Sequence, residues 1–328
     1  MKDYETGVLE QYHIEVNSTR KIRGAVLCDT AQGWFLLKEA GVSLKRISML
    51  QKLYENLQET GLRLVDRLIE NTEGNLISIG EDGRKYWLKQ WFCGRECDIR
   101  KEYELTEAVK NLTGLHSRLR GMFPEEEFQE INLCEEYQRH NRELKKVRSF
   151  IRQKVGKGDF ETAFLNCFDP MYEWADSILN QFRQSGYQEL YRGSKEQGCM
   201  IHGEYNYHNL LMTTQGIATT NFEHFQMDIQ MADLYYFLRK AMEKHQWNEK
   251  LGDCILNTYS RENALTHQEM EYLALRIAYP EKFWKIANTY YHSNKAWIPV
   301  KNLEKLQIEI RQTEEKQRFL QNIFAFHL

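Results

Sequence analysis

Three polar side chains lie in one short loop of the sequence, at a spacing that suits phosphoryl transfer. The loop covers residues 201–209 and holds His202, Glu204 and Asn209, so that a carboxylate and an amide are five residues apart. Phosphoryl transfer needs a carboxylate at the attacking hydroxyl, oxygen ligands for magnesium and a lysine on the nucleotide phosphates. The alternative interpretation makes His202 a satisfied core histidine and Asn209 a turn residue.

The elements that would position this loop begin with a small β-rich region that contains one helix. Alternating apolar and polar residues, with turn signals between them, predict short strands. These strands are expected at residues 12–16, 25–30, 33–39, 62–69, 75–82 and 84–92. Apolar residues three or four apart predict an amphipathic helix over 43–60, with Ser43 as N-cap and Gly61 as C-cap.

The remainder of the chain is predicted to be almost wholly helical. Helical periodicity or composition covers residues 100–120, 129–155, 159–185, 230–246, 248–259, 267–278, 280–292 and 302–324. One β interlude interrupts these helices, because apolar runs at 210–212 and 217–219 flank a hairpin turn. We therefore predict an α+β protein with a small antiparallel β lobe over 1–92 and a mainly helical lobe over 93–328.

The loop resembles the His-Gly-Asp-x-x-x-x-Asn loop of aminoglycoside and choline kinases. In this chain the motif is His202-Gly203-Glu204, followed by Asn209. The resemblance implies a bilobal protein-kinase-like fold in which residues 201–222 form the catalytic and metal loops. It also implies that His202 and Glu204 belong to the catalytic machinery. Asn209 would then serve both the nucleotide and the metal.

Further positions match the same superfamily. Asn221 stands where these kinases carry a metal-binding Asp, and Asp233 matches the Asp that opens the next helix and braces the catalytic loop. Lys38 ends the third strand, where the phosphate-binding lysine belongs, although an exposed strand-end lysine is the plainer interpretation. Its ion-pair partner is expected on the following helix, with Glu55 as the first candidate and Glu59 as the second.

More closely, the chain resembles the CotS-type spore coat proteins, a kinase-like family of endospore-forming bacteria. The segments that carry this resemblance are 21–25 (KIRGA), 91–98 (WFCGRECD), 140–144 (HNREL) and 279–284 (YPEKFW). The resemblance implies a role in the spore coat or its assembly. Other coat proteins or a nucleotide would be the partners, and the protein would pass from the mother-cell cytoplasm to the coat during sporulation.

Two positions depart from an active kinase. Glu204 replaces the catalytic Asp, and its extra methylene moves the carboxylate by roughly 1 Å, a displacement that can lower a rate by about 10²-fold. Asn221 replaces a metal-binding carboxylate with a neutral amide, which offers magnesium one oxygen and no charge. Glu223 could reach the metal instead, by an unusual backbone path.

Two functional hypotheses follow from these departures. The first is a pseudokinase, a kinase-like coat protein with a structural or binding role that needs no cofactor. The second is a working small-molecule or protein kinase that uses ATP and magnesium, with Glu204 as base and Asn209 as metal ligand. Asn221 favours the first, because it removes a charge that the mechanism uses directly.

Composition excludes several other classes of protein. The net charge of −3 predicts no general attraction to nucleic acid, and no run approaches the roughly 20 apolar residues that span a bilayer. The first residues have no apolar core of a signal peptide, and the seven scattered cysteines form no CxxC pair. A cytoplasmic setting with reduced thiols is therefore expected. The basic segment 137–157 is either a solvated helix face or a surface for an anionic partner.

Overall fold

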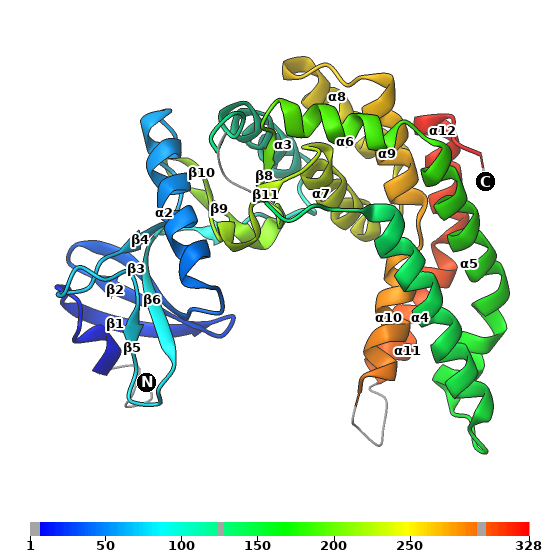
Figure 1. Ribbon diagram of the computed structural model, residues 1–328, viewed down its shortest axis with the longest axis horizontal. Helices are drawn as coiled ribbons and strands as arrows, with labels where there is room; N and C mark the ends of the chain where they lie inside the picture. Colours follow the sequence, from blue (N-terminus) through cyan, green and yellow to red (C-terminus); the bar gives the residue numbers. More distant parts are fainter. Residues whose placement is uncertain (1–6, 124–127, 294–299, 328) are drawn as a thin grey trace. The chain divides into compact units, whose positions relative to one another are not determined.

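The computed structural model describes residues 7–123, 128–293 and 300–327, and it divides into two compact units (Figure 1). The first unit contains Met1–Pro124 and Met200–Gln226, and the second contains Glu125–Cys199 and Met227–Leu328. The predicted loop 201–222 thus belongs to the same unit as the β-rich region. The boundary predicted between residues 92 and 93 follows the last long strand of the sheet, and it stays a prediction.

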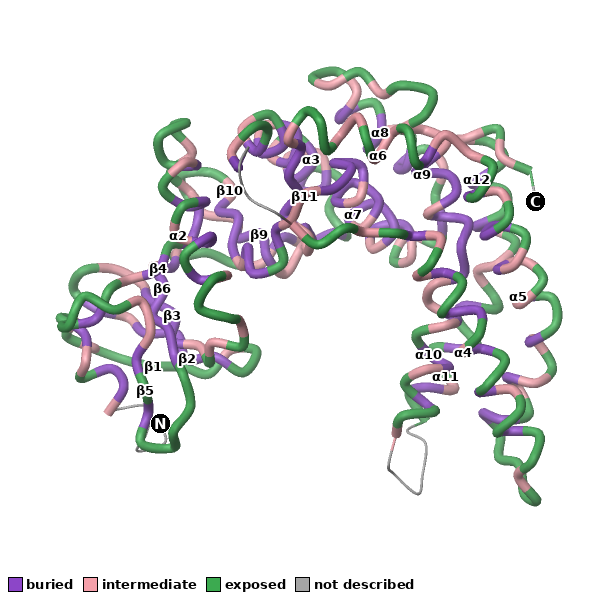
Figure 2. The backbone as a smooth tube through the Cα atoms, in the orientation of Figure 1, coloured by how far each residue is buried: buried purple, intermediate pink, exposed green. Residues whose placement is uncertain are grey.

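The first unit is built on an antiparallel sheet in the order β1-β2-β3-β6-β4, with β5 paired to β6. Its strands are β1 (Val16–Ile22), β2 (Ala25–Thr30), β3 (Gly33–Glu39), β4 (Arg67–Ile69), β5 (Ser78–Ile79) and β6 (Lys85–Trp91). Successive side chains of a strand point to opposite faces, so each register places one set of residues on one face. In Figure 2 the buried stretches of β3 and β6 run side by side.

The two faces of this sheet differ in character. One face packs Val26, Phe35, Leu37 and Leu88 against the N-terminal segment around Val8. The opposite face carries a mixture of apolar residues and cations. Its members come from β1, β2, β3 and β6, and they are Arg20, Ile22, Ala25, Leu27, Leu36, Lys38, Lys89 and Trp91. This second face positions the candidate site.

Helix α2 (Leu44–Glu59) forms where the sequence predicts it. The Ser43 side chain accepts a hydrogen bond from the Arg46 backbone N–H, and Gly61 lies just beyond the helix at a φ of +83°. A side chain at Gly61 would be strained in this left-handed conformation, which explains why glycine ends the helix. The helix contacts the segment after the hairpin, because Tyr54 packs edge-on against Phe222 at 5.9 Å between ring centroids.

The predicted hairpin is present as β9 (Leu210–Thr213) and β10 (Gly216–Thr219), and β7 (Arg95–Glu96) adds a third strand beside β9. The segment containing the hairpin opens with β8 (Met200–Ile201) and closes with β11 (Gln226–Met227). Helix α3 (Glu102–Arg118) supports it, because Asn111 donates to Thr219 Oγ1 at 2.8 Å. The hairpin thereby holds the ends of the candidate loop in place.

The second unit consists of helices. They are α4 (Leu133–Gln153), α5 (Asp159–Gln184), α6 (Tyr187–Glu196), α7 (Met231–Lys244), α8 (Glu249–Glu262), α9 (His267–Ala278), α10 (Glu281–Tyr291), α11 (Val300–Arg311) and α12 (Thr313–Phe324). Aromatic rings of α5 and α10 fill its core, with Phe164 stacked on Phe283 at 5.2 Å. The predicted α+β class, an antiparallel β region with one long helix followed by a mainly helical part, is confirmed.

Several sequence-based assignments were wrong, among them the strands predicted over 62–69 and 75–82, which cover only Arg67–Ile69 and Ser78–Ile79. The first strand covers Val16–Ile22 rather than residues 12–16, because this edge strand is exposed over most of its length and shows no apolar alternation. The segment predicted as a single helix over 302–324 is divided into α11 and α12 near Gln312. Helix α6 was not predicted, and it buries only Tyr187. A mostly exposed helix carries little of the apolar periodicity that identifies helices.

Two of the segments that resemble the CotS-type proteins pack against each other in the second unit. His140 stacks on Trp284 with 3.4 Å between ring centroids, and Tyr279 donates its hydroxyl to Asn141 Oδ1 at 2.9 Å. Burial lowers the pKa of His140 to about 4, so the stacked ring is neutral near pH 7. These segments, 140–144 and 279–284, therefore build the helical core.

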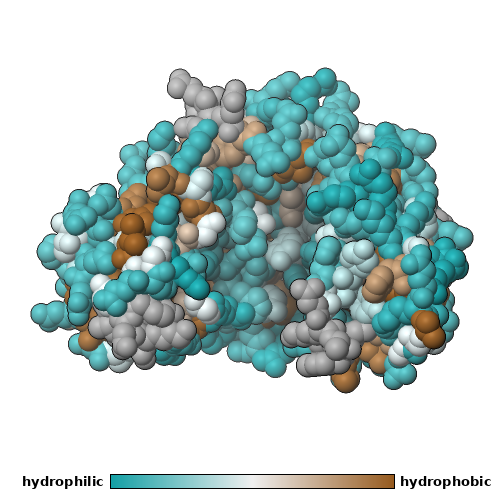
Figure 3. Space-filling model, turned by 60° about the horizontal axis from the view of Figure 1, so that its bottom comes forward, coloured by the Kyte–Doolittle hydropathy of each residue, from teal (hydrophilic) through white to brown (hydrophobic). Residues whose placement is uncertain are grey.

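The face of the molecule shown in Figure 3 is mainly hydrophilic, with some apolar patches. Large exposed apolar side chains include Tyr103 in α3 and Phe150 in α4. Within the described ranges, no helix combines the length and the apolar character that a bilayer crossing requires.

Candidate phosphoryl-transfer site

The loop 201–209 is held from behind by His202. This residue is fully buried, and its Nε2 lies 3.0 Å from the Thr220 backbone oxygen while its Nδ1 accepts the Glu204 backbone N–H at 3.1 Å. Because Nδ1 accepts, the proton of the neutral ring is on Nε2, which donates to Thr220. His202 therefore ties the start of the loop to the end of the hairpin, and it does not line the cavity described below.

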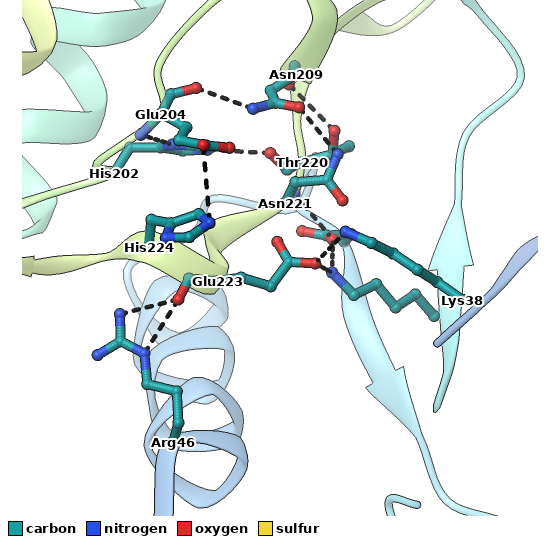
Figure 4. A network of polar contacts seen from close by, with 11 residues as sticks. Lys38, Arg46, His202, Glu204, Asn209, Thr220, Asn221, Glu223 and His224 are labelled. Atoms are coloured by element: carbon teal, nitrogen blue, oxygen red, sulfur yellow. Dashed lines mark hydrogen bonds and ion pairs between the residues drawn. The ribbon is translucent and has the colours of Figure 1, made fainter. Parts of the chain in front are cut away.

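Gly203 brings the loop against the segment that follows the hairpin. Its φ is +82°, and a Cβ at this position would lie 2.1 Å from the His224 backbone oxygen. This close approach puts the Glu204 carboxylate near His224, with 3.7 Å between Oε1 and Nε2 (Figure 4). About half of the Glu204 side chain, 46%, is exposed. Glu204 is thus accessible to a substrate hydroxyl, as a catalytic carboxylate would have to be.

Asn209 and Asn221, the two expected metal ligands, are bonded to each other, and we call them the amide pair. Asn221 Nδ2 donates to Asn209 Oδ1 at 2.9 Å, and Asn209 Nδ2 donates to the Glu204 backbone oxygen at 2.9 Å (Figure 4). Asn221 has a left-handed φ of 65°, a conformation that Asn tolerates better than most residues. The oxygen that Asn209 would offer to a metal is therefore already a hydrogen-bond acceptor.

Lys38 lies at the cavity, but its ion-pair partner is Glu223. Lys38 Nζ is 2.9 Å from Glu223 Oε1. The prediction that Glu55 pairs with Lys38 was wrong. Glu55 is exposed on α2 and accepts a hydrogen bond from Gln51 at 2.9 Å. The sequence placed the acidic partner on the helix by analogy, whereas the chain supplies it from the segment after the hairpin. Among the described residues, Glu59 has no ion pair either.

Glu223 also binds a second lysine, which sequence reasoning missed. Lys89 Nζ lies 2.8 Å from Glu223 Oε1 and 3.0 Å from Asp66 Oδ2, and the side chains of Lys89 and Asp66 are both 0% exposed. We call Lys38, Lys89, Asp66 and Glu223 the four-charge cluster. The sequence hints at this cluster only weakly: Asp66 and Lys89 lie between apolar residues of the predicted strands 62–69 and 84–92.

The four-charge cluster is electrically neutral and strongly coupled. Burial raises the pKa of Glu223, but Lys89 and Lys38 outweigh it and lower that pKa to about 2. Burial lowers the pKa of Lys89, but Asp66 and Glu223 outweigh it and raise that pKa. Glu223 and Lys89 are therefore both charged near pH 7. The cluster also reaches the amide pair, because the Asn221 backbone N–H donates to Asp66 Oδ2 at 3.0 Å.

A cavity of about 530 Å³ lies over these groups, within the first unit. Its apolar wall comes from the second face of the sheet and from β9, and includes Ile22, Leu27, Leu36, Trp91 and Leu211. Its polar floor contains Lys38, Glu204, both amides of the amide pair, Glu223 and His224. A volume of this size and an apolar wall with a few polar groups are typical of small-molecule sites.

The cavity lining also includes Arg23, from the two-residue turn between β1 and β2, together with Glu96 and His208. Arg23 donates through Nε and Nη2 to the two oxygens of Glu96, at 2.7 and 2.8 Å. His208 Nδ1 lies 2.6 Å from Glu96 Oε2 and also 2.6 Å from Arg23 Nη2, so it donates to one or accepts from the other. We call Arg23, Glu96 and His208 the mouth cluster.

The residues present suit a nucleoside better than a divalent cation. An aromatic base fits the apolar wall, and the basic side chains of Lys38 and Arg23 line the same cavity. The described residues, however, include no group of three or more His, Cys, Asp or Glu placed to hold a metal. Magnesium prefers carboxylate oxygens, and the amide pair replaces the carboxylate that would be required.

Asp233, the predicted brace of the loop, lies in the first turn of α7 and is buried. Its backbone N–H donates to the Gln230 oxygen at 3.2 Å. Asp233 belongs to the second compact unit, whereas the loop 201–209 belongs to the first. Its bracing role therefore stays a prediction.

The sheet, the loop and the hairpin together form a kinase-like fold. Solved structures with this fold include an aminoglycoside phosphotransferase from Alicyclobacillus acidocaldarius, which is 17% identical, with coverage of 96% of this chain and 93% of that chain and a TM-score of 0.84. Amicoumacin kinase hAmiN, solved with AMP-PNP, Ca²⁺ and Ami, is 12% identical, with coverage of 97% and 94% and a TM-score of 0.60. Choline kinase LicA from Streptococcus pneumoniae is 14% identical, with coverage of 91% and 93% and a TM-score of 0.50.

The sequence profile described as "spore coat putative kinase YutH" matches residues 5–323, and the chain belongs to this family. The expected resemblance to kinase-like spore coat proteins is thereby confirmed. No curated protein matches the chain. The solved structures are all less than 20% identical to this chain, so they establish its fold and leave its activity to be argued from the site.

Proposed function

We propose that this protein is a structural or binding component of the spore coat in which magnesium-dependent phosphotransfer has been lost. The amide pair is the observation that carries the proposal, because Asn209 Oδ1 and Asn221 Nδ2 are bonded at 2.9 Å where an active kinase would hold a cation between two oxygens. In this proposal the chain is a pseudokinase that acts during sporulation. It is made in the mother-cell cytoplasm and assembles with other coat proteins.

A second candidate is an active kinase that uses ATP and magnesium. Two observations favour it: the carboxylate of Glu204 is accessible, and Lys38 lines the same cavity. In this candidate Glu204 is the base, and Asn209 and Asn221 share the metal. The amide pair argues against it, because the Asn209 oxygen that would bind the metal already accepts a hydrogen bond from Asn221 Nδ2.

Turnover separates the two candidates. We expect purified protein with ATP and magnesium to release no more phosphate, and to transfer no more to coat-protein or small-alcohol acceptors, than a heat-denatured sample. Glu204→Ala should leave this background unchanged, because no reaction depends on the carboxylate. Magnesium-dependent turnover that disappears in Glu204→Ala would overturn the proposal in favour of the active kinase.

A further inference from the structure

Each carboxylate that lines the cavity lies close to a basic side chain. Glu223 holds Lys38 and Lys89, Glu96 holds Arg23, and Glu204 lies 3.7 Å from His224. The cavity lining otherwise contributes Arg20 and Arg95, of which Arg95 is already paired with Glu104 at 2.6 Å. A divalent cation would have to displace an ammonium, a guanidinium or an imidazole group to obtain a carboxylate here. The lining therefore disfavours metal and favours an anionic ligand.

Arginine side chains face the cavity where the first hairpin turns. Arg20 on β1 is paired with Leu27 on β2. Among the described residues, no carboxylate lies within ion-pair distance of Arg20. Its guanidinium carbon is 5.8 Å from the centroid of the Trp34 ring. Arg23 binds Glu96 through Nε and Nη2, and no described residue accepts a hydrogen bond from its Nη1; 59% of its side chain is exposed. Guanidinium groups bind phosphate oxygens in a bidentate manner.

The turn between β1 and β2 is too short to form a glycine-rich loop whose backbone N–H groups could bind phosphates. Arg23 and Gly24 are the only residues between β1 and β2, with φ values of 43° and 78°. Such a tight turn offers few backbone N–H groups to a ligand, because the strands pair up to Ile22 and Ala25. The charged side chain at its tip is the feature that remains available to an anion.

From this geometry we infer that the cavity binds a nucleoside phosphate without a divalent cation, and that Arg23 supplies charge to its phosphate groups. The base lies against the apolar wall, and the phosphates extend to the mouth cluster. Glu96 and His208 then hold the Arg23 guanidinium in place for the ligand. This inference concerns binding alone, so it stands or falls separately from the loss of phosphotransfer.

Calorimetric titration of the full chain with adenosine, AMP, ADP, ATP and pyrophosphate tests the inference. In EDTA we expect ADP and ATP to bind more tightly than adenosine, AMP or pyrophosphate, because only they use both the apolar wall and the cations. Magnesium at 5 mM should leave this affinity unchanged or weaken it, since the cation covers phosphate charge. Binding that requires magnesium, with a gain of about tenfold or more, would overturn the inference.

Arg23→Gln tests the role of the side chain. Loss of a hydrogen bond to a charged group costs about 1.5–3 kcal/mol, so ADP and ATP should bind about 10- to 100-fold more weakly, and adenosine equally well. Arg23→Lys should retain part of the affinity. Arg100→Gln is the matched control, because Arg100 binds Asp98 through Nε and Nη2 at 2.8 Å and does not line the cavity.

The outcomes distinguish this inference from the proposed function. Equal binding by Arg23→Gln and Arg100→Gln would overturn the assignment of Arg23, provided that circular dichroism shows both variants folded. Absence of all nucleotide binding at millimolar concentration would overturn the inference and leave the proposed function intact. Magnesium-dependent turnover would overturn the proposed function, whereas tight binding in EDTA would still support the inference.

Discussion

Glu223→Gln is expected to lower the free energy of unfolding by about 3–5 kcal/mol, the typical cost of removing one partner of a buried ion pair. Glu223 Oε1 accepts from both Lys38 and Lys89, and the Lys89 side chain is 0% exposed. Glutamine keeps an oxygen that accepts a hydrogen bond, so the loss is mainly that of the negative charge. Lys89 would keep Asp66 as its partner, whereas Lys38 would lose its carboxylate. Chemical denaturation followed by tryptophan fluorescence measures the change.

Glu55→Gln is the matched control for this prediction. It makes the same substitution on α2, at an exposed carboxylate whose hydrogen-bond donor is Gln51. Surface substitutions of this kind usually change stability by less than about 0.5 kcal/mol. A loss in Glu55→Gln as large as that in Glu223→Gln would contradict the assignment of Glu223 as the partner of the lysines.

The same cluster gives stability a pH dependence with a definite sign. The pKa of Glu223 is lowered from 4.5 in the unfolded chain to about 2 in the folded protein. A lowered carboxyl pKa stabilises the fold above the unfolded value, and this contribution is lost as pH falls toward the folded value. Stability should therefore fall between pH 4.5 and 2, and Glu223→Gln should reduce the slope in this window. An unchanged slope would show that other groups determine the acid sensitivity.

Local signals in the sequence were sufficient for much of the fold. Ser43 and Gly61 define the ends of α2, because capping and a left-handed C-terminal residue depend on their immediate neighbours. The hairpin of β9 and β10 was likewise predictable from two apolar runs and a turn. The edge strand β1 was not, since exposure on both faces removes the alternation that identifies strands.

The candidate site was predictable only where its residues follow one another closely. His202, Glu204 and Asn209 share one loop, and the structure brings Asn221 to Asn209. The partner of Lys38 could not be found in this way, because Glu223 is 185 residues away and its pairing depends on how the sheet and the hairpin pack together. A buried lysine such as Lys89 has the same sequence pattern as a surface lysine.

Asn221→Asp is expected to make stability depend on magnesium. Without the metal, the new carboxylate faces Asn209 Oδ1, which accepts from the Asn221 amide in the natural chain. Asn209 cannot turn its amide without losing the bond from Nδ2 to the Glu204 oxygen. Two acceptors left facing each other cost about 1–3 kcal/mol, so the variant should unfold at a lower temperature in EDTA.

Millimolar magnesium should restore this loss, because a carboxylate and an amide oxygen are ligands that the cation prefers. Thermal unfolding of the natural chain and of Asn221→Asp, each in EDTA and in magnesium, measures the effect. Asn248→Asp is the control: Asn248 caps α8 by accepting the Leu251 N–H, and Asp caps a helix equally well. Neither the control nor the natural chain should respond to magnesium.

The effect of magnesium on the stability of Asn221→Asp also shows which feature of the site prevents phosphotransfer. If the natural chain gains as much stability from magnesium as the variant, the amide pair is no barrier to the metal and the active kinase becomes the better interpretation. If the variant binds magnesium and still transfers no phosphate, the longer side chain of Glu204 is the remaining obstacle. Glu204 lies in the loop before the hairpin and Asn221 lies after it, so the next test is Glu204→Asp in the Asn221→Asp background.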